Sequence, residues 1–417
     1  MENLIVACIQ QRMSIPPTHE EFETEARRFM RQAQAKAARL TIFPELAGVM
    51  LAPPLISGFK LGFIKRDDQG KRRDAGFLSR SLGRLAGTTA GALGGGFRGS
   101  LERLLRKKSD ALKDAYLQTF GRLAREFGTA VVGGSVYLYD PETDTIKNRS
   151  YIFDVSGDVL GYQDKLNLAP DERDLATPGT EVSAFQVRGQ RVGLLIGHDA
   201  LYPELGRLLA MQGIDLLVGI AAISGTAAAS VLRSALALRA EENQIFSACS
   251  FLLGPNHLGK DNREDLFGQS ALMAPISLSP RGDGILMQAG TDRTEGLIAA
   301  ELRMDDLYAL RQTGRFRPRQ EMYLGTMGPV LAEFYQQGLT VDQAIEQSIT
   351  GAVEPVPEPA AFQPVEAEEA PPEMPEPEPE ELPPPEKEAL PPADVEAPPP
   401  SESEEMPPDS EPQDEEW

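Results

Sequence analysis

The sequence predicts an α/β layered domain followed by a tail of different composition. Short apolar runs rich in Val, Ile and Leu alternate with segments of helical periodicity, and polar residues follow the ends of several of these runs. The chain has 417 residues, which is enough to bury a large core.

The apolar runs have the length and composition of β-strands, because they are short and rich in β-branched, Leu and aromatic residues. We predict strands at 4–9, 40–43, 130–139, 150–155, 192–196, 215–220 and 245–252. Between them, apolar residues at helical spacing predict helices at 20–39, 101–127, 203–212 and 226–243. Pro203 suits a first helical turn.

The segment 351–417 is dominated by Pro and Glu and carries almost all of the net charge of −22. From 354 to 417 it holds 22 acidic residues against the single Lys387, a sum of −21 that leaves −1 for the preceding residues. Few apolar anchors and like-charge repulsion predict a disordered tail. The near-neutral body gives no reason to expect nucleic-acid binding. We therefore divide the chain into a domain at 1–325, a helical extension at 326–350 and the tail.

A basic segment interrupts the domain at about 55–114. Between Lys60 and Asp114 it holds 14 Lys and Arg against 6 Asp and Glu, and its middle is rich in Gly, Ala and Thr. Three interpretations stay open: a surface helix with solvated cations, a contact with an anionic membrane or acidic partner, and a contact with the chain's own acidic tail.

The remaining composition predicts a cytoplasmic protein. Cys8 and Cys249 cannot build a disulfide framework, and both lie in apolar runs that favour buried, reduced thiols. The first residues lack the pattern of a secretory signal, and no run reaches the roughly 18 uncharged apolar residues of a membrane span.

Three segments place polar residues at the end of an apolar strand, where open α/β sheets expose their chemistry. They are Phe-Pro-Glu-Leu ending the strand at 40–43, Tyr-x-x-Lys-x-x-Leu from Tyr162, and Gly-Leu-Leu-Ile-Gly-His-Asp-Ala-Leu-Tyr-Pro-Glu from Gly193. In this order the three resemble the signature regions of the carbon–nitrogen hydrolase (nitrilase) superfamily. Further stretches with the same resemblance start at Val132, Asn148, Gln212, Arg239, Phe267 and Glu295.

The resemblance implies a four-layer αββα sandwich, often dimerised through its helical face, that cleaves amides or nitriles without a cofactor. Glu45 then matches the general base, Lys165 the lysine that stabilises the oxyanion, and Glu172 a supporting glutamate. The family's nucleophilic cysteine falls at position 197, where this chain has Gly197. Because attack on an amide needs a thiolate or an equivalent nucleophile, this glycine puts the activity in question.

Other residues are candidates for a substitute nucleophile or for ligand contacts. His198 and Asp199 follow Gly197, and we predict that they belong to the binding site; His198 is a less favoured nucleophile, because neighbouring residues at a strand end point in opposite directions. Cys249 and Ser224 are weaker candidates. The three histidines lack metal-ligand spacing, so no metal is expected.

Three functions remain as hypotheses. The first is a catalytically silent member of the superfamily that binds a small amide, acyl or carboxylate ligand, or a partner. The second is an active C–N hydrolase that uses water or a substitute nucleophile. The third is a peripheral membrane or assembly role through the basic segment and the acidic tail.

Overall fold

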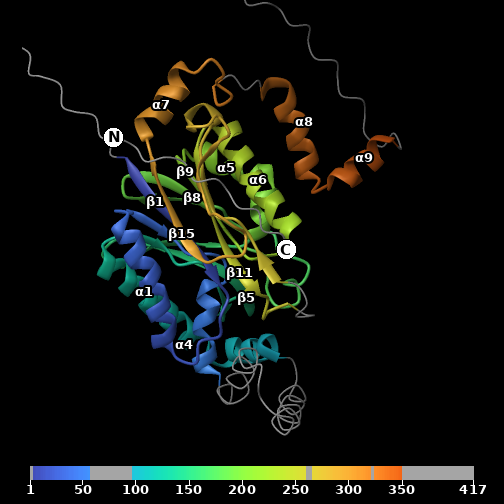
Figure 1. Ribbon diagram of the computed structural model, residues 1–417. Coiled ribbons are helices and arrows are strands. Elements are labelled where there is room, and N and C mark those ends of the chain that lie inside the picture. The colour runs from blue at the N-terminus through green and yellow to red at the C-terminus, as the bar shows by residue number, and fades with distance from the viewer. Residues whose placement is uncertain (1–2, 57–95, 260–264, 321–323, 350–417) are drawn as a thin grey trace, which may run out of the picture. The chain divides into compact units, whose positions relative to one another are not determined.

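The computed structural model describes residues 3–56, 96–259, 265–320 and 324–349 (Figure 1). The predicted tail and residues 57–95 of the basic segment lie outside these ranges. The chain divides into a compact unit at Met1–Pro329 and a second unit at Val330–Trp417. Helix α8 (Leu324–Gln336) spans the boundary, and α9 (Val341–Ile349) belongs to the second unit.

The first half of the sheet structure is built on β1 (Leu4–Arg12). It pairs in parallel with β2 (Leu40–Ile42) and antiparallel with β15 (Gly296–Leu302). The sheet continues through the strands β3 (Ala130–Val132), β5 (Thr145–Phe153), β4 (Val136–Asp140) and β6 (Val159–Asp164).

The second half is built on three parallel strands, β8 (Gln190–Ile196), β9 (Leu216–Ala221) and β11 (Phe246–Pro255). Its antiparallel strands are β7 (Ala184–Val187), β13 (Ala271–Met273) and β14 (Ile285–Gln288), with the short pair β10 (Ile223–Ser224) and β12 (Asp265–Phe267) at the end of β11. The halves join where the ends of β1 and β11 pair in parallel.

The two halves pack face to face, with helices on their outer sides. Alternate residues such as Val6 and Cys8 of β1 share one buried core with Leu194 and Ile196 of β8, as the two-residue period of strands requires. Helices α1 (His19–Ala35) and α4 (Gly96–Phe127) cover the first half, and α5 (Pro203–Met211) and α6 (Thr226–Asn243) cover the second (Figure 1). This order confirms the predicted αββα layers.

Shorter elements complete the described chain. Helix α7 (Met304–Thr313) follows β15. Single 3-10 turns lie at Ala47–Leu51, Pro53–Leu55, Gly197–Leu201 and Ile276–Leu278. No helix in the described ranges is long and apolar enough to cross a membrane.

The predicted strand 130–139 is wrong as a single element. It breaks into β3 and β4, because Gly134 has a φ of +69° and a Cβ there would lie 2.3 Å from the carbonyl oxygen of Pro44. The predicted helix 20–39 ends at Ala35, shortly before Ala37 adopts a left-handed φ of 54°.

Part of the basic segment, predicted to interrupt the domain at about 55–114, belongs to the core. Helix α4 begins at Gly96 and runs unbroken to Phe127, and its side chains Phe97, Leu101 and Leu105 are buried. The boundary at 114 therefore falls inside a helix that packs against the first half of the sheet. The two cysteines are free and buried, as predicted, and burial raises the pKa of both thiols.

Candidate functional site

The parallel strands set the position of the candidate site. Because β2, β1, β11, β9 and β8 run in the same direction, the residues that follow them meet at one edge. Glu45 follows β2, Gly197 follows β8 and Ala222 follows β9.

Glu45 is held in a buried turn. It is 1% exposed, and the next residue, Leu46, takes a left-handed φ of 63°. The Leu46 amide donates to the hydroxyl of Ser135 at 2.9 Å. This contact fixes the turn, so that the Glu45 carboxylate projects into the interior.

Lys165 joins the two predicted glutamates. Its ammonium donates to Glu45 Oε1 at 2.8 Å and to Glu172 Oε2 at 2.5 Å. The three side chains are 2%, 1% and 9% exposed in the order Lys165, Glu45, Glu172. The structure therefore brings together the three residues that the sequence analysis predicted from separate segments.

Two further side chains and a backbone amide complete the cluster. Asn148 Nδ2 donates at 3.1 Å to both glutamates, and the hydroxyl of Tyr137 donates to Glu172 Oε1 at 2.7 Å. The Ala222 amide donates to Glu45 Oε2 at 2.8 Å. None of these three residues was predicted to belong to the site. Asn148 has a signal in the sequence, since it is a polar residue between Ile146 and Ser150 on the inward side of β5.

Asn148 also presents an unused acceptor. Its Oδ1 is buried and accepts no hydrogen bond from any described residue. A flipped amide would place this oxygen against the carboxylates of Glu45 and Glu172, so the hydrogen bonds fix the assignment. A buried acceptor without a donor is costly.

Gly197 faces the same cluster. Its φ is +53°, and a Cβ built on its backbone would lie 2.7 Å from Glu45 Oε2 and 2.9 Å from Lys165 Nζ. A side chain at this position would therefore point at the carboxylate and the ammonium. In this chain the Glu45–Lys165 ion pair lies against the position that such a side chain would occupy.

His198 and Asp199 have different surroundings. The buried carboxylate of Asp199 accepts from the amides of Leu166 and Asn167 at 3.1 and 2.6 Å, so it holds the segment that carries Lys165. His198 is half-buried, and its Nδ1 has no partner among the described residues. Burial and the nearby Lys165 lower the pKa of His198, which favours a neutral imidazole at neutral pH.

Burial and the opposite charges nearby shift the pKa values of the ion-paired residues in opposite directions. Burial, together with the neighbouring carboxylate of Glu172, raises the pKa of Glu45 to about 7 despite the opposing charge of Lys165. Burial alone would lower the pKa of Lys165, but the two carboxylates outweigh it and raise that pKa. Burial disfavours the Glu172 anion, yet Lys165 and hydrogen bonds hold its pKa below the ordinary value.

The raised pKa of Glu45 predicts a pH dependence of stability. A carboxyl whose pKa is higher in the folded state contributes stability that is fully present below its unfolded pKa, near 4.5, and is lost as pH rises through about 7. The lost contribution is at most about 3 kcal/mol. Glu25, whose pKa burial and Glu295 raise to about 7, gives the same sign. The difference between the wild type and Glu45→Gln therefore isolates Glu45.

Urea unfolding from pH 5 to pH 8 measures this difference. We expect the free energy of unfolding of the wild type to fall relative to Glu45→Gln as pH rises. Parallel pH profiles for the two proteins would show that Glu45 does not titrate in this range.

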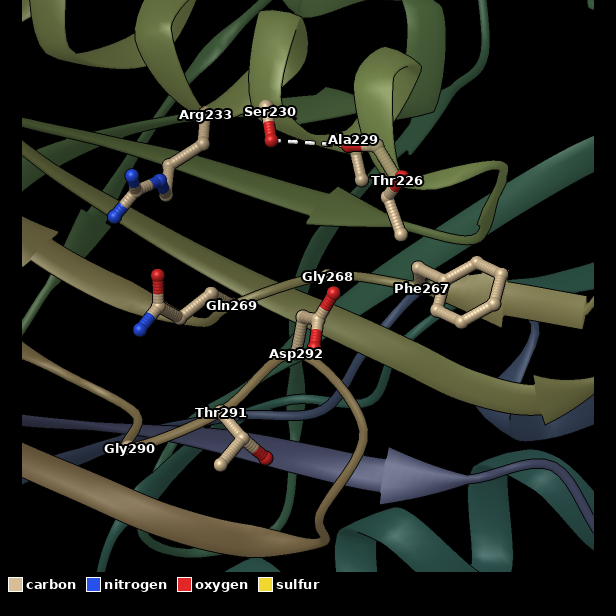
Figure 2. A pocket seen from close by; sticks show the side chains of 10 residues that line it. All are labelled: Thr226, Ala229, Ser230, Arg233, Phe267, Gly268, Gln269, Gly290, Thr291 and Asp292. Carbon is tan, nitrogen blue, oxygen red and sulfur yellow. Dashed lines mark hydrogen bonds between the residues drawn. The ribbon is translucent and has the colours of Figure 1, made fainter.

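The described residues contain no group of three or more His, Cys, Asp or Glu placed to hold a metal. A cavity of about 370 Å³ lies elsewhere, between the start of α6 and the loop at 290–292 (Figure 2). Its lining includes Arg233, Phe267 and Asp292 but none of the predicted site residues. We place the candidate site at Glu45, because converging polar groups and a perturbed pKa mark functional sites better than volume alone.

The four-layer fold and the buried Glu–Lys–Glu cluster define a class of carbon–nitrogen hydrolase-like proteins. The sequence matches the family described as carbon-nitrogen hydrolase over residues 5–312. The chain belongs to this family.

Relatives and a solved structure agree with the assignment. An (R)-stereoselective amidase from Pseudomonas sp is 30% identical over 217 residues, which cover 52% of this chain and 72% of the amidase. The probable hydrolase YhcX of Bacillus subtilis is 26% identical over 48% of this chain, and the match spans 39% of that protein's length. A mutant amidase from Nesterenkonia sp. AN1, with acrylamide added at its active-site cysteine, has a similar fold, with a TM-score of 0.51 and 21% identity over 74% of this chain and 97% of that chain.

Proposed function

We propose that this chain binds a small amide, acyl or carboxylate compound at the Glu45–Lys165–Glu172 cluster and does not hydrolyse it through a covalent intermediate. The observation that carries the proposal is the position of Gly197. A side chain there would point at both Glu45 and Lys165, as a nucleophile between a base and an oxyanion-stabilising cation must. Glycine offers no attacking atom.

The remaining hydrogen-bonding groups suit a ligand of this class. The Lys165 ammonium has three N–H donors, and its described acceptors are one oxygen of each glutamate. The third donor is available to a carbonyl or carboxylate oxygen. Asn148 Oδ1 offers an acceptor for an amide N–H. A primary amide carries both complementary groups.

A second candidate function is slow hydrolysis by water. A carboxylate with a pKa of about 7 can accept a proton from water near neutral pH, and Lys165 would stabilise the developing negative charge. No covalent intermediate with the protein forms in this route. Water adds to the carbonyl carbon of a primary amide as Glu45 takes its proton, and the tetrahedral adduct then collapses with cleavage of the C–N bond while Glu45 returns the proton to the leaving nitrogen, so that ammonia and the carboxylic acid are released. Without a thiolate, this route is expected to be orders of magnitude slower.

Ligand-dependent stability tests binding apart from catalysis. A primary amide that binds the folded chain raises its melting temperature in proportion to the logarithm of ligand concentration over Kd. We expect this shift in the wild type and a roughly tenfold weaker apparent Kd in Asn148→Ala, which removes the unused acceptor but not the ion pairs.

Gln312→Ala is the control, because it removes an exposed amide from α7. We expect this variant to respond to the amides as the wild type does. A melting temperature unchanged by a broad panel of amides, acids and acyl compounds would contradict the proposed binding. If the amides raise the melting temperature of Asn148→Ala as much as that of the wild type, Asn148 Oδ1 is not an acceptor for the ligand.

A further inference from the structure

Three arginines from distant segments converge on the carboxyl end of helix α6. Arg207 donates to the carbonyl of Glu242 at 3.5 Å, Arg319 to that of Asn243 at 3.1 Å and Arg311 to that of Gln244 at 2.9 Å. The three acceptors are consecutive carbonyls at the end of α6. All three arginines are half-buried.

One part of this arrangement is ordinary helix capping. The last carbonyls of a helix lack partners within the helix, and the partial negative charge at this end attracts cations. This need does not require three full charges, because the carboxyl end of a helix carries only about half a negative charge.

The positive charge of the cluster is only partly neutralised. Arg311 forms an ion pair with Asp215 at 2.7 Å. Within the described part of the chain, Arg207 and Arg319 contact no carboxylate, and each makes one hydrogen bond to a carbonyl. Three guanidinium groups against one carboxylate leave a charge of +2 at one place.

The electrostatic consequence is visible at Arg319. Burial and the neighbouring Arg311, with a further effect of Arg207, lower the pKa of Arg319 to about 10. A guanidinium has five N–H donors, and Arg319 uses one of them toward a described residue. The cluster thus combines surplus positive charge, partial burial and unused donors. An anion at this point would relieve the repulsion.

We propose that Arg207, Arg311 and Arg319 form a binding site for a phosphate group. The surplus charge of +2 matches a phosphate, which carries about −1.5 to −2 at neutral pH, better than a single carboxylate. Arginine also suits phosphate oxygens because its planar donors bind them in pairs. Arg319 lies beyond the family match, which ends at residue 312, and the site is separate from the Glu45 cluster.

Calorimetric titration of the full chain with inorganic phosphate tests the proposal, with ionic strength held constant by chloride. We expect one phosphate per chain and a Kd at least about tenfold weaker in Arg319→Gln, since a charge-assisted pair is lost. Arg319→Lys should bind phosphate with intermediate affinity, because it keeps the positive charge but loses the paired planar donors of the guanidinium. Arg281→Gln, a substitution at an exposed arginine outside the cluster, should bind as the wild type does.

If Arg319 only capped α6, its replacement would lower stability without changing phosphate affinity. The titration therefore separates helix capping from phosphate binding. If Arg319→Gln does not fold, Arg207→Gln gives the same test, because Arg207 makes only the long contact at 3.5 Å. Equal affinities in wild type and variant, or no binding to the wild type, would overturn the proposal. Binding of a synthetic peptide of residues 366–388 at these arginines, with no binding of phosphate, would also overturn it and assign the site to carboxylates.

Discussion

Replacing Lys165 with Met is expected to lower the free energy of unfolding by about 3–5 kcal/mol at pH 8. The substitution preserves most of the side-chain volume but leaves Glu45 and Glu172 buried without their shared cation. An unpaired buried charge is far more costly than a lost surface pair, because burial removes its hydration.

The loss should shrink as pH falls. Without Lys165 the two carboxyls attract protons more strongly, and a protonated pair no longer carries the unpaired charge. Urea unfolding at pH 5 and pH 8 measures both effects. Arg303→Met, which breaks the exposed ion pair with Asp306, is the control and should cost less than about 1 kcal/mol. A Lys165→Met loss no larger than this control would mean that the cluster is hydrated and not buried.

Replacing Gly197 with Ala is expected to cost about 2–4 kcal/mol, for two separable reasons. The first is the left-handed backbone, which costs an L-residue about 1 kcal/mol or more. The second is contact, because the new methyl group would lie 2.7 Å from Glu45 Oε2 and 2.9 Å from Lys165 Nζ. Both atoms end flexible side chains, but their buried hydrogen bonds resist displacement.

Gly128→Ala provides the matched control. Gly128 has a similar φ of +62°, and a Cβ there meets nothing within 4 Å. The excess cost of Gly197→Ala over Gly128→Ala in urea unfolding therefore measures the collision with the ion pair. Equal costs would show that the Glu45–Lys165 pair moves aside freely, and that position 197 still has room for a side chain.

The fold could be predicted because its strands and helices have clear periodicity, and because the three signature segments keep their order. Glu45, Lys165 and Glu172 could be predicted as a set for the same reason. Tyr137 and Ala222 could not, since their contacts depend on how strands far apart in sequence pair. Ala222, for example, meets a residue 177 positions away.

Gly197 shows most clearly what could not be predicted from the sequence alone. The sequence has a glycine where the resemblance implies a cysteine, but only the packing reveals that the Glu45–Lys165 ion pair occupies the space next to this glycine. The arginine cluster likewise could not be predicted from the sequence. Arg207 and Arg319 are 112 positions apart, and no local pattern indicates that both reach the end of α6.

Ammonia release from a panel of primary amides, compared between the wild type and Gly197→Cys, tests the central claim most directly. Circular dichroism first selects a temperature at which both proteins are folded. We expect the wild type to match the background rate and Gly197→Cys to exceed it, because the thiol supplies an attacking atom next to Glu45 and Lys165. Wild-type hydrolysis above background that Glu45→Gln abolishes would contradict the claim that this chain lacks a working nucleophile, and no gain in a folded Gly197→Cys would contradict the claim that the rest of the site is retained.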